Sequence, residues 1–156
     1  MVDLKNFQKN VYEIIGCAMR VHNILNFGLL EAIYRESLAY EIRLHGIDCE
    51  EEQEIDCYYG KHLLKKSYRM DIVAGDIIIE LKAVREIRPE HRAQLCNYLR
   101  LTKKPLGLLI NFGGPILVGE RWAYDEITNE CYVVDKEMKR LPMDEYSTES
   151  DWDEND

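Results

Sequence analysis

The chain has 156 residues, 46% of them hydrophobic and 31% charged, which is ordinary for a soluble globular protein of one domain. No apolar run approaches the roughly 18 residues that a membrane helix needs, so we expect no membrane partner. The net charge is −9, which taken alone argues against a nucleic-acid partner.

The negative charge is concentrated at the C-terminal end. Residues 144–156, DEYSTESDWDEND, carry seven acids and no base, and without them the chain holds 22 acids against 20 bases. Such a segment buries too little apolar surface to offset its ordering entropy. We therefore expect one folded domain at residues 1–143, followed by an acidic, disordered tail. The domain itself is nearly neutral and is compatible with a nucleic-acid partner.

The cysteines indicate a reducing compartment. There are five, an odd number, and no two form a CxxC pair. The N-terminal segment MVDLKNFQKN lacks the basic-then-apolar order of a signal peptide. We therefore expect free thiols and a cytoplasmic location. A zinc site is not expected, because neither the cysteines nor the four histidines show ligand spacing.

Two helices are predicted in the N-terminal third. Apolar residues recur at helical spacing over residues 5–25, and the Asn-Phe-Gly stretch at 26–28 interrupts the pattern. A second helix follows from about Leu29 to His45, where Gly46 is suited to end it. The apolar positions of the two helices are Phe7, Val11, Ile14, Ile15, Ala18, Val21, Leu25, Ile33, Leu38, Ile42 and Leu44.

From Cys49 onward the apolar pattern changes to that of strands, with one further helix among them. Pro89 opens that helix, which runs to about Leu101, because the first helical position needs no N–H donor. Two helices, then strands, a third helix and more strands predict an α/β domain with a central mixed sheet flanked by helices. The predicted strands are residues 54–60, 63–74, 76–84, 105–113, 116–124 and 130–135.

The second and third strands carry charges where strands are usually apolar. If Gly75-Asp76 forms a two-residue type II′ turn, Asp71 lies directly opposite Glu80, and Lys82 lies on the same face of the hairpin. The other face is then a continuous apolar surface. Its residues are Met70, Ile72, Ala74, Ile77, Ile79, Leu81 and Ala83.

Opposed carboxylates need a compensating charge. With Cβ atoms roughly 5 Å apart, Asp71 and Glu80 repel by about 3 kcal/mol at an effective dielectric of about 20. Lys82 can offset part of this, and a divalent cation such as Mg²⁺ or Mn²⁺ could offset more. Such an ion would activate water for attack on a phosphodiester. The alternative is an ion-paired strand face without metal, in which Lys82 and Arg69 hold the two acids.

Three motifs resemble those of known nucleases. Asp71, eight residues and then Glu80-Leu81-Lys82 resemble the PD-(D/E)xK motif. The stretch GLLEAIY, Gly28 to Tyr34, resembles the signature of the GxxExxY protein family, a branch of the same superfamily. The stretch QLCNY, Gln94 to Tyr98, resembles the QxxxY motif of RecB-type nucleases, and LGLLINFG at 106–113 is similar to a strand of the GxxExxY family. The resemblance covers about residues 10–122 and implies a restriction-endonuclease-like fold.

The resemblance also implies roles for single residues. Asp71, Glu80 and the backbone carbonyl of Leu81 are implied as ligands of Mg²⁺ or Mn²⁺, and Lys82 as the catalytic lysine. Glu31 matches a helical glutamate that completes the metal site, often through water. The last two matches, Gln94 and Tyr98, are implied to line the site and contact substrate. Met70 stands where the motif is named for proline, a position that varies across the superfamily.

Purely structural interpretations of several residues stay open. Glu31 is also compatible with an exposed helix acid, and Gln94 and Tyr98 with a polar helix face. Tyr34 is more typical of a packing aromatic, and His22 of a hydrogen-bonded core histidine. The segment KKSYR, 65–69, fits a solvated strand end as well as a phosphate contact.

The sequence thus predicts a metal-dependent nuclease that hydrolyses phosphodiester bonds. The rival hypothesis is a non-catalytic nucleic-acid- or protein-binding module that keeps the fold, because family membership does not guarantee activity. The intact Asp-Glu-Lys set favours the enzyme. The sequence is compatible with a homo-oligomer and does not distinguish DNA from RNA. A phosphate-binding GxxxxGK[ST] loop does not occur.

Overall fold

The computed structural model describes residues 2–142, and it confirms the α/β class with a mixed sheet. The predicted tail, 144–156, lies outside the described residues. Each predicted helix and strand is present, with ends shifted by a few residues. The elements are η1 (Leu4–Phe7), α1 (Gln8–Leu25), α2 (Glu31–Leu44), β1 (Glu50–Tyr59), β2 (His62–Ala74), β3 (Ile77–Lys82), α3 (Pro89–Thr102), β4 (Leu106–Asn111), β5 (Val118–Asp125) and β6 (Glu130–Val134).

The described strands form one six-stranded sheet in the order β1-β2-β3-β4-β5-β6. Only β3 and β4 pair in parallel, because α3 carries the chain across between them. The other neighbours are antiparallel. The two parallel strands therefore sit at the centre of the sheet, and β3 is the strand that carries Glu80 and Lys82.

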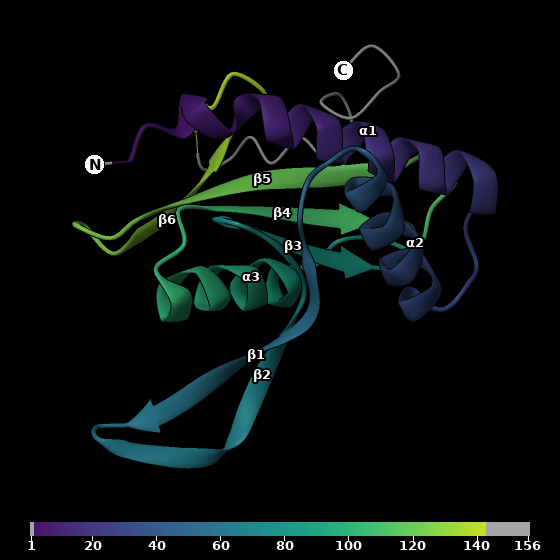
Figure 1. The fold of residues 1–156 in the computed structure, drawn as a ribbon. Coiled ribbons are helices and arrows are strands. Elements are labelled where there is room, and N and C mark those ends of the chain that lie inside the picture. Colours follow the sequence, from purple (N-terminus) through teal and green to yellow (C-terminus); the bar gives the residue numbers. More distant parts are fainter. Residues whose placement is uncertain (1, 143–156) are drawn as a thin grey trace.

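Helices cover both faces of the sheet (Figure 1). One core cluster joins α1 and α2 to one face, and a second joins α3 to the other. Successive residues of β3 alternate between them: Ile77 and Ile79 belong to the first cluster, and Ile78 to the second. A strand buried on both sides needs apolar residues at consecutive positions, which explains the run of three isoleucines. The same alternation turns Glu80 and Lys82 towards α3.

The N-terminal helices pack largely as their spacing predicts. The apolar face of α1 is buried, including Val11, Ile14 and Val21. In α2 the apolar residues Ile33 and Leu44 are exposed. The buried residues of α2 are Tyr34, Leu38, Ala39 and Ile42.

The β2–β3 hairpin has the predicted register. Ile72 pairs with Ile79 and Ala74 with Ile77. Gly75 adopts a φ of +60°, as the first central residue of a type II′ turn requires. The prediction that places Met70 on the Ile72 face is wrong.

Met70 is buried instead with the α3 cluster. The change of face coincides with an irregularity on both strands beside it. The Asp71 N–H bonds to the Glu80 side chain, and Glu52 on β1 has a φ of +51°. We attribute the rotation of β2 between Met70 and Ile72 to this irregularity, because a regular strand would keep the two on one face.

The β1–β2 hairpin continues beyond the sheet as an arm. β2 pairs with β3 only over residues 72–74, whereas its pairing with β1 extends from Val73 to His62. Figure 1 shows the hairpin leaving the body beside α3 and curving away from it. Between the pairs Asp56–Ser67 and Tyr58–Leu63, β2 has three residues where β1 has one, and such bulges bend a strand. We call residues 57–68 the outer arm.

Candidate active site

Asp71 and Glu80 lie side by side on β2 and β3, as the hairpin register predicts. The Asp71 N–H donates to Glu80 Oε1 at 2.9 Å, and the Leu81 N–H donates to Asp71 Oδ2 at 2.8 Å. Each carboxyl group therefore accepts a backbone hydrogen bond from the opposite strand. These two bonds fix both carboxyl groups to the backbone.

Burial disfavours negative charge on this pair of carboxyl groups. Glu80 is only 3% exposed and Asp71 is half-buried. Burial, and after it the charge of Asp71, raises the pKa of Glu80 well above its usual value. Burial also raises the pKa of Asp71, against the lowering effect of the Leu81 N–H bond and of Lys82. The pair thus resists holding two negative charges without a further cation.

A chain of hydrogen bonds joins Lys82, Gln94 and Tyr98 on the face of the sheet that α3 covers. The Lys82 Nζ donates to Gln94 Oε1 at 2.9 Å, and Gln94 Nε2 donates to the Tyr98 hydroxyl at 3.0 Å. Gln94 and Tyr98 are one turn apart on α3, so their side chains meet. Burial, and next the charge of Glu80, raises the pKa of Tyr98 to about 12. Tyr98 therefore keeps its proton at neutral pH.

Glu31 approaches from the other layer of the molecule. It is the first residue of α2 and is half-buried. Burial and then the charge of Asp71 raise the pKa of Glu31, while Lys82 and Arg35 lower it. Its carboxyl group is therefore within electrostatic reach of both strands of the hairpin.

A comparison with protein-family models shows the family to which the chain belongs. The model of the PD-(D/E)XK nuclease superfamily matches residues 8–121, which contain all of the residues named above. The chain belongs to the PD-(D/E)XK nuclease superfamily. Members of this superfamily are generally nucleases that use divalent metals. The finer assignment to the GxxExxY branch stays a prediction.

Other comparisons add little to the superfamily assignment. A solved structure described as "Crystal structure of SSO0001" is 20% identical, with a TM-score of 0.48. The match covers 79% of this chain and 63% of that one, so the present chain spans less than two thirds of its length. No curated protein matches the chain. Over residues 2–142, no helix is both long and apolar enough to cross a membrane.

The acids at this site do not form a complete set of protein ligands for a metal ion. Within the described residues, no three His, Cys, Asp or Glu side chains gather as a ligand set. Asp71 and Glu80 are therefore a two-carboxylate site. The part of Glu31 in metal binding, which the resemblance assigns through water, stays a prediction.

Two residues beside the superfamily motifs were missed by sequence reasoning. Arg35 ion-pairs with Glu51 at 3.6 Å and Glu52 at 3.4 Å, and its charge lowers the pKa of both Asp71 and Glu31. Its position four residues after Glu31 on one helix face was the available signal.

The other missed residue is Tyr68 on β2. Its ring centroid lies 5.6 Å from that of Tyr98, so it contacts the site from the arm. No local motif marks it, because the contact depends on how the arm leaves the sheet. Its neighbour Arg69, in the KKSYR segment, ion-pairs with Glu54 at 3.5 Å across the arm.

Tyr34 and His22 are buried in the core, as the structural interpretation of each residue predicts. The Tyr34 ring stacks on Phe112 with centroids 4.9 Å apart, and its hydroxyl donates to the Asn26 carbonyl at 2.6 Å. His22 is 6% exposed, with Nε2 at 2.8 Å from the Gly114 carbonyl. Tyr34, the last residue of the Gly28–Tyr34 signature, thus holds the loop before Glu31 in place.

The end of β3 is held by a buried amide. Asn111 is 1% exposed; its Nδ2 donates to the Val84 carbonyl at 2.9 Å, and its Oδ1 accepts the Val84 N–H at 3.0 Å. The Phe112 N–H donates to the Lys82 carbonyl at 2.8 Å. A Cβ on Gly113 would lie 2.0 Å from the Val84 carbonyl oxygen, so only glycine allows this approach. These contacts anchor the backbone from which Lys82 projects.

Proposed function

We propose that the chain is a metal-dependent nuclease that hydrolyses phosphodiester bonds of nucleic acid. The observation that carries the proposal is the Asp71–Glu80 pair, whose carboxyl groups are buried side by side with raised pKa values in a domain of this superfamily. Buried acids are costly to a fold unless something compensates their charge. A divalent cation would remove that cost and give the pair a function.

The donor atoms suit Mg²⁺ or Mn²⁺. Asp71 and Glu80 offer carboxylate oxygens, and we take the Leu81 carbonyl as a third ligand. Mg²⁺ binds through one or two carboxylates and keeps several waters, so two acids are sufficient. Asp71 Oδ1 and Glu80 Oε2 take no part in the two backbone bonds. When bound, the ion supplies a Lewis acid that lowers the pKa of water and offsets phosphate charge.

Lys82 is the proposed catalytic residue. Gln94, itself held by Tyr98, fixes its ammonium group beside the acid pair. An ammonium group at that position stabilises the negative charge that develops on the phosphoryl oxygens in the transition state. Gln94 and Tyr98 also line the approach to the site, where they would contact substrate. Glu31 would act on the ion or on its waters from α2.

Finer assignments belong to the same proposal. The Gly28–Tyr34 signature supports the GxxExxY branch, with Glu31 as its central acid. The five cysteines are all free, which supports a reducing, cytoplasmic location. The rival function, a binding module without catalysis, is favoured by the net charge of −9. We retain it as an outcome of the experiment below.

The test is cleavage of labelled single- and double-stranded DNA and RNA by the purified full chain with Mn²⁺ or Mg²⁺. We expect the wild type to cut at least one substrate and EDTA to stop it. Lys82→Ala and Glu80→Gln should each lose at least about a hundredfold in rate. Lys9→Ala, an exposed lysine on α1, is the matched control and should cut normally.

Two results would contradict the proposal. If the wild type binds one of the four substrates and cuts none, the binding-module function is correct. If both site variants cut as fast as the wild type, the activity comes from another site or another protein.

A further inference from the structure

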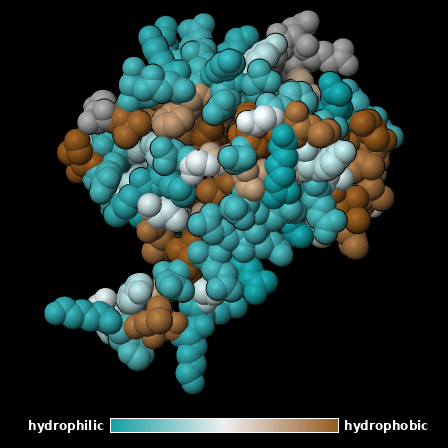
Figure 2. Space-filling view, viewed as in Figure 1, coloured by the Kyte–Doolittle hydropathy of each residue, from teal (hydrophilic) through white to brown (hydrophobic). Residues whose placement is uncertain are grey.

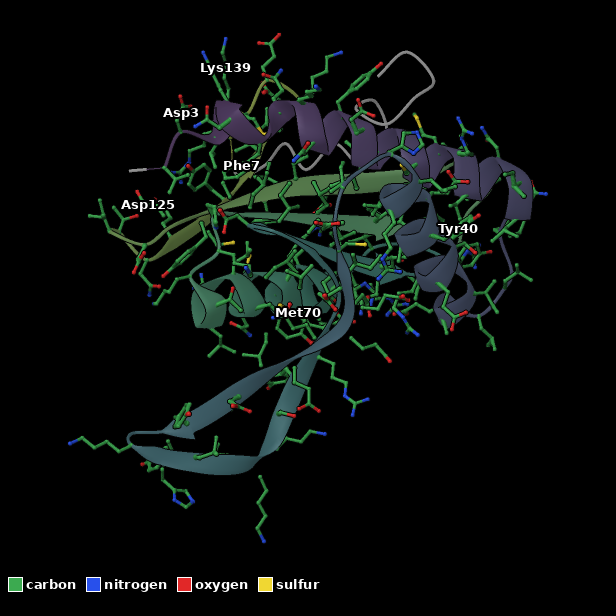
Figure 3. All side chains as sticks on the ribbon, viewed as in Figure 1. Asp3, Phe7, Tyr40, Met70, Asp125 and Lys139 are labelled. Atoms are coloured by element: carbon green, nitrogen blue, oxygen red, sulfur yellow. The ribbon has the colours of Figure 1, made fainter. Side chains whose placement is uncertain are left out.

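The outer arm has a composition unlike that of the whole chain. Its residues, 57–68, include three lysines, one histidine and three tyrosines and no acid, whereas the chain as a whole carries a charge of −9. Figure 2 shows the arm as a separate lobe below the body. In Figure 3, long side chains that end in nitrogen project from it into open space. The arm is therefore a local positive surface on an acidic protein.

The positive charges of the outer arm are not neutralised within the fold. Over residues 2–142 no ion pair involves Lys61, Lys65 or Lys66. Three of the acids nearer the foot of the arm are paired with arginines. Glu51 and Glu52 contact Arg35, and Glu54 contacts Arg69. The lysines are thus free to bind an anion.

The arm also exposes aromatic side chains that no core requires. Tyr59 is 82% exposed and Tyr58 is 60% exposed, near the turn at Gly60. Leu63 and Leu64 on the return strand are exposed as well. An isolated two-stranded hairpin gains little stability in water, so these side chains do not serve the fold. Exposed apolar side chains gathered on a projection are typical of a binding surface.

One face of the arm leads directly to the proposed catalytic lysine. The Tyr68 ring contacts the Tyr98 ring at 5.6 Å, and Tyr98 is joined through Gln94 to Lys82 by bonds of 3.0 Å and 2.9 Å. Lys66 lies two residues before Tyr68 on β2. A ligand at the acid pair that extends along this side would meet the arm next.

We propose that the outer arm binds a single-stranded stretch of nucleic acid that runs from the reacting phosphate along Tyr68 towards the turn. Lysines contact the phosphates and tyrosines stack on the bases, the combination by which proteins hold single strands. A duplex would offer phosphates but would hide the base faces that the tyrosines need. The inference rests on the proposed function, because it takes the reacting phosphate to lie at Lys82.

The test is binding of a fluorescein-labelled 20-nucleotide single strand of DNA, RNA and the matching duplex to the full chain in EDTA, at several salt concentrations. Changing Lys61, Lys65 and Lys66 to Gln should weaken single-strand binding and lower the salt slope of the logarithm of affinity by about 2. Tyr59→Ala should weaken it between about fivefold and a hundredfold. All of these side chains are exposed, so the melting temperature should not change.

The matched control changes Lys5, Lys9 and Arg20 to Gln, an equal charge change on exposed residues of η1 and α1. This variant should bind as the wild type does. The inference is wrong if the arm variants also bind as the wild type does, or if only the duplex is bound. It is also wrong if they dissociate a dimer of this chain without changing nucleic-acid binding, because the arm is then an interface between copies.

The two proposals fail in different ways. If the arm variants lose binding but the wild type cuts nothing, the arm binds single strands as inferred, and the proposed function is wrong. If the wild type cuts and the arm variants cut the same single strand with an unchanged KM, the proposed function is correct and the arm inference is wrong.

Discussion

At the scale of single residues, the Asp71–Glu80 pair departs from a simple opposition of charges. Sequence spacing predicts that the two carboxyl groups face each other and repel. In the structure each also accepts a backbone N–H from the other strand, and burial exceeds mutual repulsion as the cause of the raised Glu80 pKa. The fold therefore holds the acids in place while leaving them short of positive charge, as the proposed cation site requires.

The pH dependence of stability should report this lack of compensating positive charge. A carboxyl group with a raised pKa binds more protons in the folded than in the unfolded state, over the pH range between its two pKa values. The free energy of unfolding in EDTA should therefore fall as pH rises above about 4.5, through the raised pKa values of Asp71, Glu80 and Glu31. Urea unfolding from pH 4 upward measures it.

Asp71→Asn is the variant that isolates the pair. The amide oxygen can still accept the Leu81 N–H, while the charge that raises the pKa of Glu80 and Glu31 is removed. At pH 8 in EDTA this variant should equal the wild type or exceed it by about 1 kcal/mol, and the difference should shrink towards pH 5. A loss of stability at pH 8 would show that the Asp71 charge is compensated in the metal-free protein.

At the scale of elements, β3 and its connection to α3 position Lys82, the proposed catalytic side chain. The run of isoleucines and the turn at Gly75 are local signals, and from them the hairpin, its register and the face of Glu80 and Lys82 follow. Met70 does not follow, because its face depends on a distortion at Asp71 that arises only when two distant side chains enter the ladder. The buried amide of Asn111 was missed for a similar reason: its partner, Val84, is far away in sequence.

Asn111→Leu should show that this amide holds the end of β3. Leucine is similar in size but leaves the Val84 N–H and carbonyl without their partner, at a cost of about 1–3 kcal/mol for each group that water does not reach. Since Val84 is half-buried, we expect a loss of about 2 kcal/mol in the free energy of unfolding. Asn97→Leu, on the exposed side of α3, is the control and should change it by less than about 0.5 kcal/mol. Equal effects of the two variants would contradict this role.

At the scale of the whole molecule, the site was more predictable from sequence than the overall shape. Asp71, Glu80 and Lys82 are joined by one hairpin, so local spacing was enough to group them. The family resemblance indicated Gln94 and Tyr98, which share one helix face, and also Glu31. Glu31 and Arg35 reach the site from the opposite layer. The arm escaped prediction because strand patterns give the length of β1 and β2 but not where the pairing with β3 ends.

The net charge of the whole chain does not describe the charge near the site. A net charge of −9 argues against a nucleic-acid partner, yet much of that charge lies at residues 144–156. Pairing with Arg35 and Arg69 neutralises several acids of β1, whereas the outer arm keeps its lysines unpaired within residues 2–142. The local electrostatic potential near the site decides whether the protein attracts a polyanion there. The distribution of charge is therefore compatible with the proposed substrate.

The central claim, that Asp71 and Glu80 hold a divalent cation beside a catalytic lysine, is tested most directly by calorimetric titration of Mn²⁺ into the wild type, Lys82→Ala and Glu80→Gln. The wild type should bind one ion. Lys82→Ala should bind at least as tightly, because a nearby positive charge is removed, and Glu80→Gln should bind at least about tenfold more weakly. Absence of binding to the wild type, or equal affinity in Glu80→Gln, would contradict the claim.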